Sequence, residues 1–145
     1  MSPPPVYLIL LVPITLLLFV GATWWWRPLD QQPGEPPANL QVVTSEEDLT
    51  NKLNEANRDG KLVVIDFFAV WCEPCQLISP HFDRYAKLFP NVIFLRVDVP
   101  NHQSIAKKYN VEAMPTFKFI KNGDIKDTMV GGKKSELGKK LALHQ

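Results

Sequence analysis

The sequence predicts an α/β domain in which helices cover both faces of a mixed central sheet. Three observations support this fold class. Strand-like apolar runs alternate with segments of helical period, a two-residue turn signal joins the last two runs, and one strand is apolar on both faces. The predicted domain occupies residues 41–145, after an apolar segment at 1–26 and a proline-rich linker at 27–40.

The first part of the domain is predicted to contain two strands and a helix. Residues 41–43 form a short edge strand. Ser45, with an acidic residue three positions later, begins a helix that Gly60 ends. Residues 62–68 form a strand that is apolar on both faces except at Asp66, as expected where helices cover both sides of a sheet.

The middle of the domain continues this alternation. A helix is predicted over residues 76–89, beginning at the second of two cysteines, with a bend at Pro80. Residues 92–97 form the next predicted strand, and Asn101 is the predicted cap of a short helix over residues 103–109.

A hairpin and a helix close the domain. Residues 116–120 and 125–130 flank Asn122-Gly123, a strong signal for a two-residue turn between antiparallel strands. Ser135 is the predicted start of a last helix that extends to about Leu143.

The only two cysteines of the chain, Cys72 and Cys75, are separated by two residues and follow an apolar strand at the start of a helix. Unpaired N–H groups and the positive end of the helix dipole favour thiolate over thiol at such a place. A thiolate attacks a disulfide, and a second thiol nearby resolves the mixed disulfide. The spacing therefore predicts thiol–disulfide redox chemistry.

Composition argues against other functions. There are 16 basic and 15 acidic residues, so the net charge of +1 suggests no nucleic-acid partner. A basic cluster near the C-terminus is interpreted as the solvated face of the last helix. Its members are Lys133, Lys134, Lys139 and Lys140.

A structural zinc site is the other interpretation of two closely spaced cysteines. It would need two more ligands at short spacing. The three histidines are His81 in a predicted helix, His102 in a polar connection and His144 at a C-terminal end expected to fray. They do not form a second ligand pair, so no metal is predicted.

Residues 1–26 carry no charged side chain, and residues 6–26 form a nearly unbroken apolar run of 21 residues. About 20 helical residues span the hydrocarbon core of a bilayer. Trp24 to Trp26 end the run, as an interfacial aromatic belt would, and Arg27 follows. We therefore expect a single-pass membrane anchor. A signal peptide is the alternative, because the small residues Val20-Gly21-Ala22 suit cleavage after residue 22.

The linker over residues 27–40 contains prolines and a glycine that disfavour a packed element, so it is predicted to be an extended spacer. In polyproline II form it would extend about 40 Å. Arg27, on the domain side of the anchor, favours a domain in the cytosol by the positive-inside tendency. The secretory or organelle lumen is the alternative location.

Five segments resemble the thioredoxin family in residue type, order and spacing, from about residue 42 to residue 143. They are residues 64–75 (VIDFFAVWCEPC), 92–98 (VIFLRVD), 114–117 (MPTF), 121–123 (KNG) and 130–132 (VGG). The resemblance implies the thioredoxin fold and a protein-disulfide reductase.

Three residues receive catalytic roles. Cys72, expected at the exposed start of the helix, is the predicted nucleophile, and Cys75, turned toward the protein, is the resolving thiol. Asp66 lies in an apolar strand, where desolvation raises the pKa of a carboxyl group. The resemblance implies that this carboxyl lies behind the cysteines and carries the proton of the resolving thiol.

Further residues are assigned to the substrate site by the resemblance. Pro115 matches the family proline that follows a cis peptide bond, which leaves the backbone of Met114 exposed to an extended substrate segment. Trp71 and Gly131 complete an apolar rim around the cysteines. Pro74 rigidifies the dithiol and favours reductase behaviour.

Two residues are expected to tune the site. Glu73 replaces the glycine that usually follows the first cysteine, and its negative charge should disfavour the Cys72 thiolate. The reduction potential is therefore left open. Arg96 stands where many bacterial thioredoxins place a lysine near the buried aspartate, and is expected to serve the same electrostatic purpose.

The predicted function is reduction of protein disulfides by a membrane-tethered domain, bound to the membrane through residues 6–26 and expected to be a monomer. No bound cofactor is expected, because the resemblance implies a thioredoxin reductase partner that carries NADPH and flavin. Two alternatives remain. One is a lumenal isomerase or oxidase, against which Pro74 argues because oxidase motifs often have histidine there. The other is a binding or assembly module whose redox site is incidental.

Overall fold

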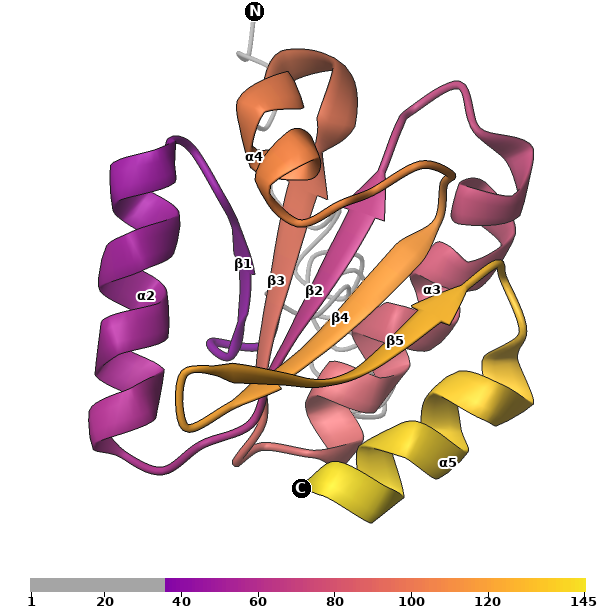
Figure 1. Ribbon diagram of the computed structural model, residues 1–145. Helices are drawn as coiled ribbons and strands as arrows, with labels where there is room; N and C mark the ends of the chain where they lie inside the picture. Colours follow the sequence, from indigo (N-terminus) through magenta and orange to yellow (C-terminus); the bar gives the residue numbers. More distant parts are fainter. Residues whose placement is uncertain (1–35) are drawn as a thin grey trace, which may run out of the picture. The chain divides into compact units, whose positions relative to one another are not determined.

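The computed structural model describes residues 36–145, so the predicted anchor, its signal-peptide alternative and most of the linker lie outside the described residues. A five-stranded sheet of order β1-β3-β2-β4-β5 forms the centre of this part of the chain (Figure 1). The strands are β1 Leu40–Val42, β2 Val63–Phe68, β3 Ile93–Asp98, β4 Thr116–Lys121 and β5 Asp124–Val130. The first three are parallel and the last two antiparallel to their neighbours, which confirms the predicted mixed sheet.

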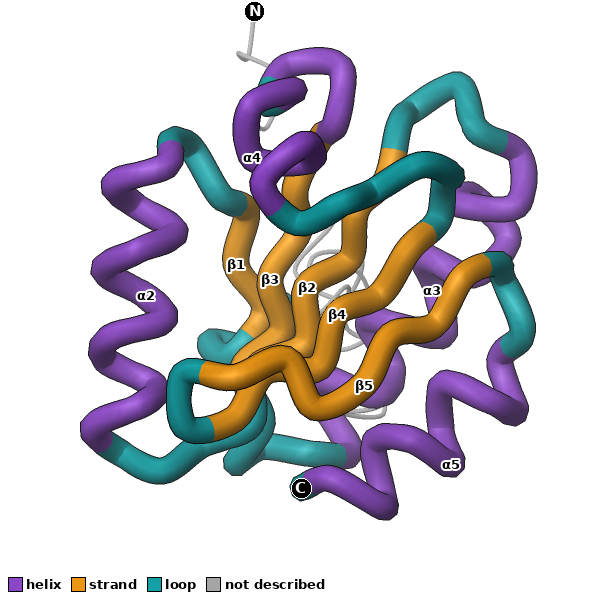
Figure 2. The backbone as a smooth tube through the Cα atoms, in the orientation of Figure 1, coloured by secondary structure: helices purple, strands orange, loops and turns teal. Residues whose placement is uncertain are grey.

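Two α-helices cover each face of the sheet (Figure 2). Helices α2 Glu46–Arg58 and α4 Gln103–Lys108 lie on one face, and α3 Glu73–Leu88 and α5 Lys134–His144 on the other. The α3/α5 face buries an aromatic cluster of Phe82, Phe94, Phe117 and Phe119. Each such side chain contributes about 2–3 kcal/mol when fully buried. Within residues 36–145, no helix combines the length and the apolar character needed to cross a bilayer.

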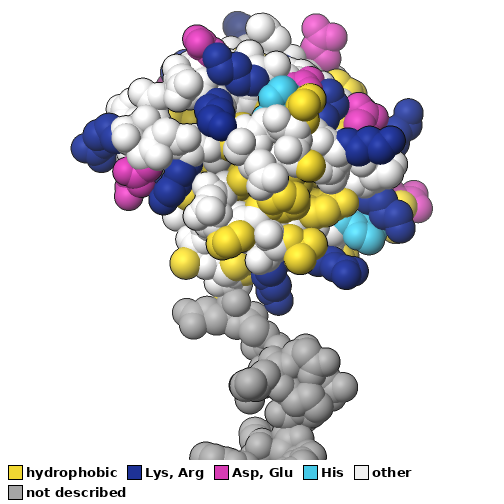
Figure 3. Space-filling view, turned by 90° about the horizontal axis from the view of Figure 1, so that it is seen from below, with side chains coloured by type: hydrophobic (Ala, Val, Ile, Leu, Met, Phe, Trp, Pro, Cys, Tyr) yellow, Lys and Arg dark blue, Asp and Glu magenta, His cyan; other side chains and the backbone are white. Residues whose placement is uncertain are grey.

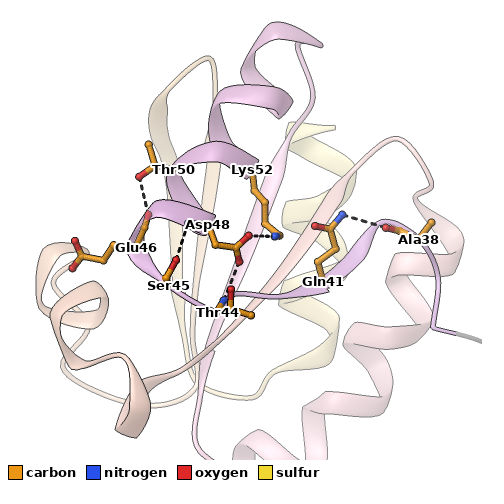
Figure 4. A network of polar contacts seen from close by, with 8 residues as sticks. All are labelled: Ala38, Gln41, Thr44, Ser45, Glu46, Asp48, Thr50 and Lys52. Carbon is orange, nitrogen blue, oxygen red and sulfur yellow. Dashed lines mark hydrogen bonds and ion pairs between the residues drawn. The ribbon is translucent and has the colours of Figure 1, made fainter.

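Local signals set the ends of α2 as predicted. The Ser45 hydroxyl accepts the Asp48 N–H at 3.0 Å, and the Asp48 carboxylate accepts the Thr44 N–H at 2.9 Å (Figure 4). Lys52 pairs with Asp48 one turn later, and its hydrogen bond holds the pKa of Asp48 below the usual range. The helix is followed by Gly60, whose φ of +64° is a left-handed conformation that glycine adopts without steric cost.

The predicted hairpin is also confirmed. Asn122 and Gly123 have φ angles of 56° and 81°, the left-handed pair that a two-residue turn needs to match the twist of its strands. Lys121 and Asp124 are the last paired residues before the turn.

Helix α3 begins earlier than predicted. It starts at Glu73, three residues before the expected Gln76, and Cys72 is its N-cap. The reason is Pro74, which lies in the first helical turn, where the missing N–H of proline has no intrahelical partner to lose. Pro80 lies inside the helix, which continues through it to Leu88.

One predicted cap is wrong, and one predicted helix start is displaced by one residue. Asn101 does not cap α4, because its side-chain amide donates to Asp98 at 2.6 Å and so secures the preceding 3₁₀ turn. Ser135 lies within α5, which begins at Lys134 after an N-cap residue, Lys133, that makes no side-chain cap. In both cases a polar residue was expected to mark the helix start, and the structure places the cap or the start one position away.

The C-terminal helix is held in place rather than frayed at His144. Asp127 of β5 accepts a hydrogen bond from Lys140 at 2.7 Å, and its carboxylate lies 3.0 Å from His144 Nε2. Lys121 also donates to the carbonyl oxygen of His144 at 3.2 Å. The other three lysines of the C-terminal cluster are exposed, as predicted.

The ends of the sheet differ in what they carry. At the end where the parallel strands begin, here called the linker pole, the side-chain amide of Asn39 lies within 3.0 Å of the carbonyl oxygens of Ala86, Phe89 and Val92. Figure 3 views this end from below, with Lys and Arg side chains around a group of apolar ones. At the opposite end, the dithiol pole, β2 leads into the two cysteines.

Candidate active site

Cys72 and Cys75 form a disulfide at the N-terminus of α3. The sulfur of Cys72 accepts the backbone N–H of Cys75 at 3.3 Å, so the first cysteine takes the place of a helix-capping side chain. The same N–H would stabilise a Cys72 thiolate after reduction.

The exposure predicted for Cys72 is wrong for this disulfide form. Cys72 is 6% exposed and Cys75 4%, so accessibility does not separate the two sulfurs. Both pack with Ala69 and, at the edge of the cluster, Phe68 and Met114. What separates them is their place on α3, because only Cys72 lies outside the helix and receives one of its unpaired N–H groups.

A loop far away in the sequence completes the dithiol pole. The Met114–Pro115 peptide bond is cis, as predicted, and the Gly131 N–H donates to the Pro115 carbonyl at 2.8 Å. Gly132 packs so closely that a β-carbon there would meet the Pro74 carbonyl oxygen at 3.1 Å. The segments around the cysteines, Pro115 and Gly131 are thus brought together by backbone contacts.

Exposed apolar side chains flank the two cysteines in the sequence. Trp71 is 69% exposed, as a rim residue should be, and Met114 is partly buried against the cysteines. Val70 and Leu77 are each 68% exposed and lie next to the motif in sequence, although sequence reasoning did not select them. An apolar residue in a strand end or a helix is usually taken as core, so only the structure reveals these two as surface.

Asp66 is buried in the strand that leads to the cysteines, with 2% of its surface exposed. Its side chain shares the α3 side of β2 with Val64, because side chains two apart along a strand point the same way. Burial raises the pKa of Asp66 to about 7, since desolvation disfavours the anion. One carboxylate oxygen, Oδ1, has no hydrogen-bond partner within residues 36–145.

Arg96 is the nearest cation to this carboxyl group. Its Nε lies 3.6 Å from Asp66, while its Nη2 lies 3.0 Å from Asp83 and donates to the Ser79 hydroxyl at 2.7 Å. The guanidinium also lies over the ring of Phe82. Burial raises the Asp66 pKa most, the positive charge of Arg96 lowers it by less, and the negative charge of Asp83 raises it further.

The two residues between the cysteines are exposed. Glu73 lies in the first turn of α3, where an anion interacts favourably with the helix dipole, and water screens its effect on Cys72. Pro74 presents its ring to solvent and its carbonyl to Gly132. In residues 36–145, no three His, Cys, Asp or Glu side chains converge as metal ligands would.

Comparison with known proteins agrees with this geometry. The family model described as thioredoxin matches residues 41–142. The chain is 50% identical to thioredoxin H5 of Arabidopsis thaliana over 93 residues, which cover 64% of this chain and 79% of that protein. It is 44% identical to thioredoxin H4-2 of Oryza sativa subsp. japonica over 103 residues, 71% of this chain and 78% of that protein.

Solved structures give the same result. The thioredoxin of Fasciola hepatica matches with a TM-score of 0.70 and 41% identity, covering 72% of this chain and 99% of that one. The thioredoxin NaTrxh of Nicotiana alata matches with a TM-score of 0.72 and 32% identity, covering 79% and 99%. Residues 36–145 form one compact unit about as long as these whole proteins, so this domain is sufficient to fold on its own.

Proposed function

This chain belongs to the thioredoxin family and is a protein-disulfide oxidoreductase, and from that premise we propose that it works as a membrane-tethered reductase. The observation that carries the reducing role is the buried Asp66, a carboxyl group whose pKa of about 7 suits proton exchange with a thiol near neutral pH.

The proposed reaction begins at Cys72. Its thiolate attacks one sulfur of a substrate disulfide, a mixed disulfide forms, and the other substrate sulfur leaves as a thiolate. Asp66 takes the proton from the Cys75 thiol, and the resulting thiolate attacks Cys72. The substrate's second sulfur is then released, so two electrons pass to the substrate and the Cys72–Cys75 disulfide is formed.

The substrate would lie across the apolar rim. Trp71, Val70 and Leu77 offer contact area without a deep pocket, which suits protein substrates of varied sequence. The Met114 backbone beside the cis peptide bond would pair with an extended substrate segment, and Gly131 leaves room for it.

Thioredoxins need no bound cofactor and are reduced by thioredoxin reductase. We propose that such a reductase carries NADPH and flavin and returns the two electrons to the Cys72–Cys75 disulfide. Arg96 would assist because its positive charge favours the ionised form of Asp66, so that the carboxyl group can release its proton again between cycles.

The reduction potential of the domain, residues 36–145, tests the direction of the reaction. Equilibration with a glutathione buffer should give a value near about −270 mV, as for thioredoxin, whereas a value near about −180 mV would indicate an isomerase. The matched variants Cys72→Ser and Cys75→Ser test the roles of the two thiols. Cys75→Ser should accumulate mixed disulfides with substrate and Cys72→Ser should not; the reverse pattern would overturn the assignment.

The tether is proposed from the apolar run of residues 6–26 and the tryptophans that end it. The described geometry is compatible with it, because Asn39 places the start of the domain at the linker pole, away from the cysteines. The full chain should float with lipid vesicles while residues 36–145 stay in solution. Arg27 favours a cytosolic domain, so protease added to sealed inside-out vesicles should digest it; protection would reverse the orientation.

A further inference from the structure

The α2/α4 face of the sheet is incompletely covered. Helix α4 has six residues and extends about 9 Å, whereas the six-residue strand β4 extends about 20 Å. A pocket of about 370 Å³ remains where the coverage ends, lined by residues of α2, the end of α4 and the β4–β5 turn.

The floor of this pocket is apolar. It consists of Leu53 from α2, Val63 from β2, Ile120 from β4 and Ile125 from β5. Ile125 is 49% exposed, whereas the next apolar residue of β5, Met129, is buried in the core on the α3/α5 side. The floor offers a ligand an apolar surface that water contacts unfavourably.

The rim supplies hydrogen-bond donors and positive charge. Lys61, Lys108 and Tyr109 line it, and no Asp or Glu does. Lys61 has a partner in Asp59 at 3.3 Å, but Lys108 forms no ion pair within residues 36–145. The ring of Tyr109 packs against Phe67, and burial raises the pKa of its hydroxyl, which therefore stays a donor at neutral pH.

Asparagine side chains extend the same pattern. Asn54 and Asn57 approach from α2 and Asn122 from the turn. In the part of the chain that the structure describes, none of the three side-chain amides makes a hydrogen bond to another group. The rim therefore has several donors that an anionic ligand could satisfy together.

We propose that this pocket binds a small amphipathic carboxylate, with its apolar body on the Ile120–Ile125 floor and its carboxylate at Lys108 and the neighbouring donors. The volume suits a ligand at the small end of the usual range for protein pockets. A purely polar anion would leave the apolar floor in contact with water. A cation would be repelled by the lysines and would find no negatively charged side chain among the lining residues. These two mismatches select the combination of an apolar body and a single negative charge.

The site is separate from the redox chemistry. Val63, in the pocket floor, begins the strand that ends at Phe68 beside the cysteines, and five residue steps along a strand correspond to about 17 Å. Occupancy should therefore leave the dithiol accessible. The proposal stands or falls independently of the reductase role, because none of its residues contacts a cysteine.

Nuclear magnetic resonance titration of the ¹⁵N-labelled domain, residues 36–145, tests the proposal with octanoate and 1-naphthoate as probes. At least one carboxylate should shift the backbone signals of Lys108, Asn122 and Gly123 while those beside Cys72 stay in place. Octanol, the neutral analogue of octanoate, should bind more weakly. Absence of these shifts with both carboxylates, or shifts scattered over the surface, would overturn the proposal.

Two matched pairs of variants sharpen the test. Lys108→Gln should weaken binding about fivefold, the size of one partly exposed charge pair, while Lys107→Gln, one residue away and outside the pocket, should not. Ile125→Ser should weaken binding, and Val42→Ser, at an apolar residue on the other edge strand that is 60% exposed against 49% for Ile125, should leave it unchanged. Equal effects within either pair would mean that the carboxylates bind elsewhere.

Discussion

The linker pole and the dithiol pole are built by different kinds of contact. At the linker pole, Asn122-Gly123 forms its own local turn, and the Asn39 amide is shared by three backbone carbonyl oxygens, so the polar groups there have partners. At the dithiol pole, Cys72, Pro115 and Gly131 come from distant segments and meet through tertiary contacts. The difference also concerns energy, because the dithiol pole contains a buried carboxyl group with an oxygen that has no hydrogen-bond partner in residues 36–145.

The two poles therefore contribute differently to the stability of the domain. The linker pole pairs its polar groups and so stabilises the domain, whereas Asp66 destabilises the fold when it ionises. A buried polar group that lacks a hydrogen-bond partner is expected where a function requires it. Mutations at the two poles should therefore have effects of opposite sign on stability.

The largest effect is expected for Asp66→Asn, which should stabilise the domain in a pH-dependent way. At pH values below 3.8 the carboxyl is protonated in both folded and unfolded chains, so the native residue carries no penalty. As pH rises toward about 7 the unfolded chain loses this proton first, and the native domain loses relative stability. Above pH 7 the variant should be more stable by up to about 4 kcal/mol.

Urea unfolding of the oxidised domain at pH 4, 6 and 8 measures this difference. Asp124→Asn is the control, because its carboxyl is exposed and should give a difference that hardly varies with pH. The Asp66 variant should also reduce protein disulfides more slowly. A stability difference that stays constant with pH would contradict the burial argument.

The opposite sign is expected for Asn39→Ala at the linker pole. The variant leaves carbonyl oxygens of Ala86, Phe89 and Val92 without the amide that they share, and should lower the free energy of unfolding by about 1–3 kcal/mol. Disulfide reduction by the folded domain should continue at the native rate. Chemical unfolding and an insulin-reduction assay check both statements.

Asn91→Ala provides the matched control for this position. Asn91 is exposed and makes no side-chain hydrogen bond within residues 36–145, so its replacement should change stability little. Equal losses in the two variants would show that Asn39 does not secure the start of the domain.

A smaller effect is expected when the cap of α2 is removed. Ser45→Ala deletes the acceptor of the Asp48 N–H and should lower stability by about 1 kcal/mol. Ser135→Ala, within the first turn of α5, should be neutral or slightly stabilising because this serine is not the cap. Thermal unfolding of both variants compares the two serines, and a larger loss for Ser135 would refute the cap assignments.

The smallest effect is expected for Glu73→Gln at the dithiol pole. The side chain is exposed, and exposed charges interact by well under 1 kcal/mol, so the reduction potential should move by no more than about 10 mV. Equilibration with glutathione measures the shift. A change several times larger would mean that Glu73 tunes Cys72 despite its exposure.

Much of the domain was predictable because its signals act over a few residues. Strand order along the chain, the Ser45 cap and the Asn122-Gly123 turn were predicted correctly. The Asn101 cap was not, and α5 begins one residue before the predicted Ser135, since several residues near a helix start can each serve and the backbone selects one. The start of α3 was placed late because Pro74 was not recognised as part of the first turn.

The candidate site was likewise predictable only in part from the sequence. Cys72, Cys75 and Asp66 stood out from residue type and spacing, and burial of Asp66 followed from the apolar strand around it. The near-equal burial of the two cysteines, the exposure of Val70 and Leu77 and the sharing of Arg96 with Asp83 did not. These depend on which segments pack beside them.

By itself, the sequence determined the alternation of strands and helices, the redox pair and an apolar N-terminal run, because hydrophobic period and cysteine spacing are local properties. Only the tertiary structure decided that Gly131 meets Pro115, that Arg96 lies between two carboxylates, and that α2 and the β4–β5 turn line one pocket. Each of these is a contact between residues distant in the chain, and the free energy of such a contact depends on burial and geometry that exist only once the domain has folded.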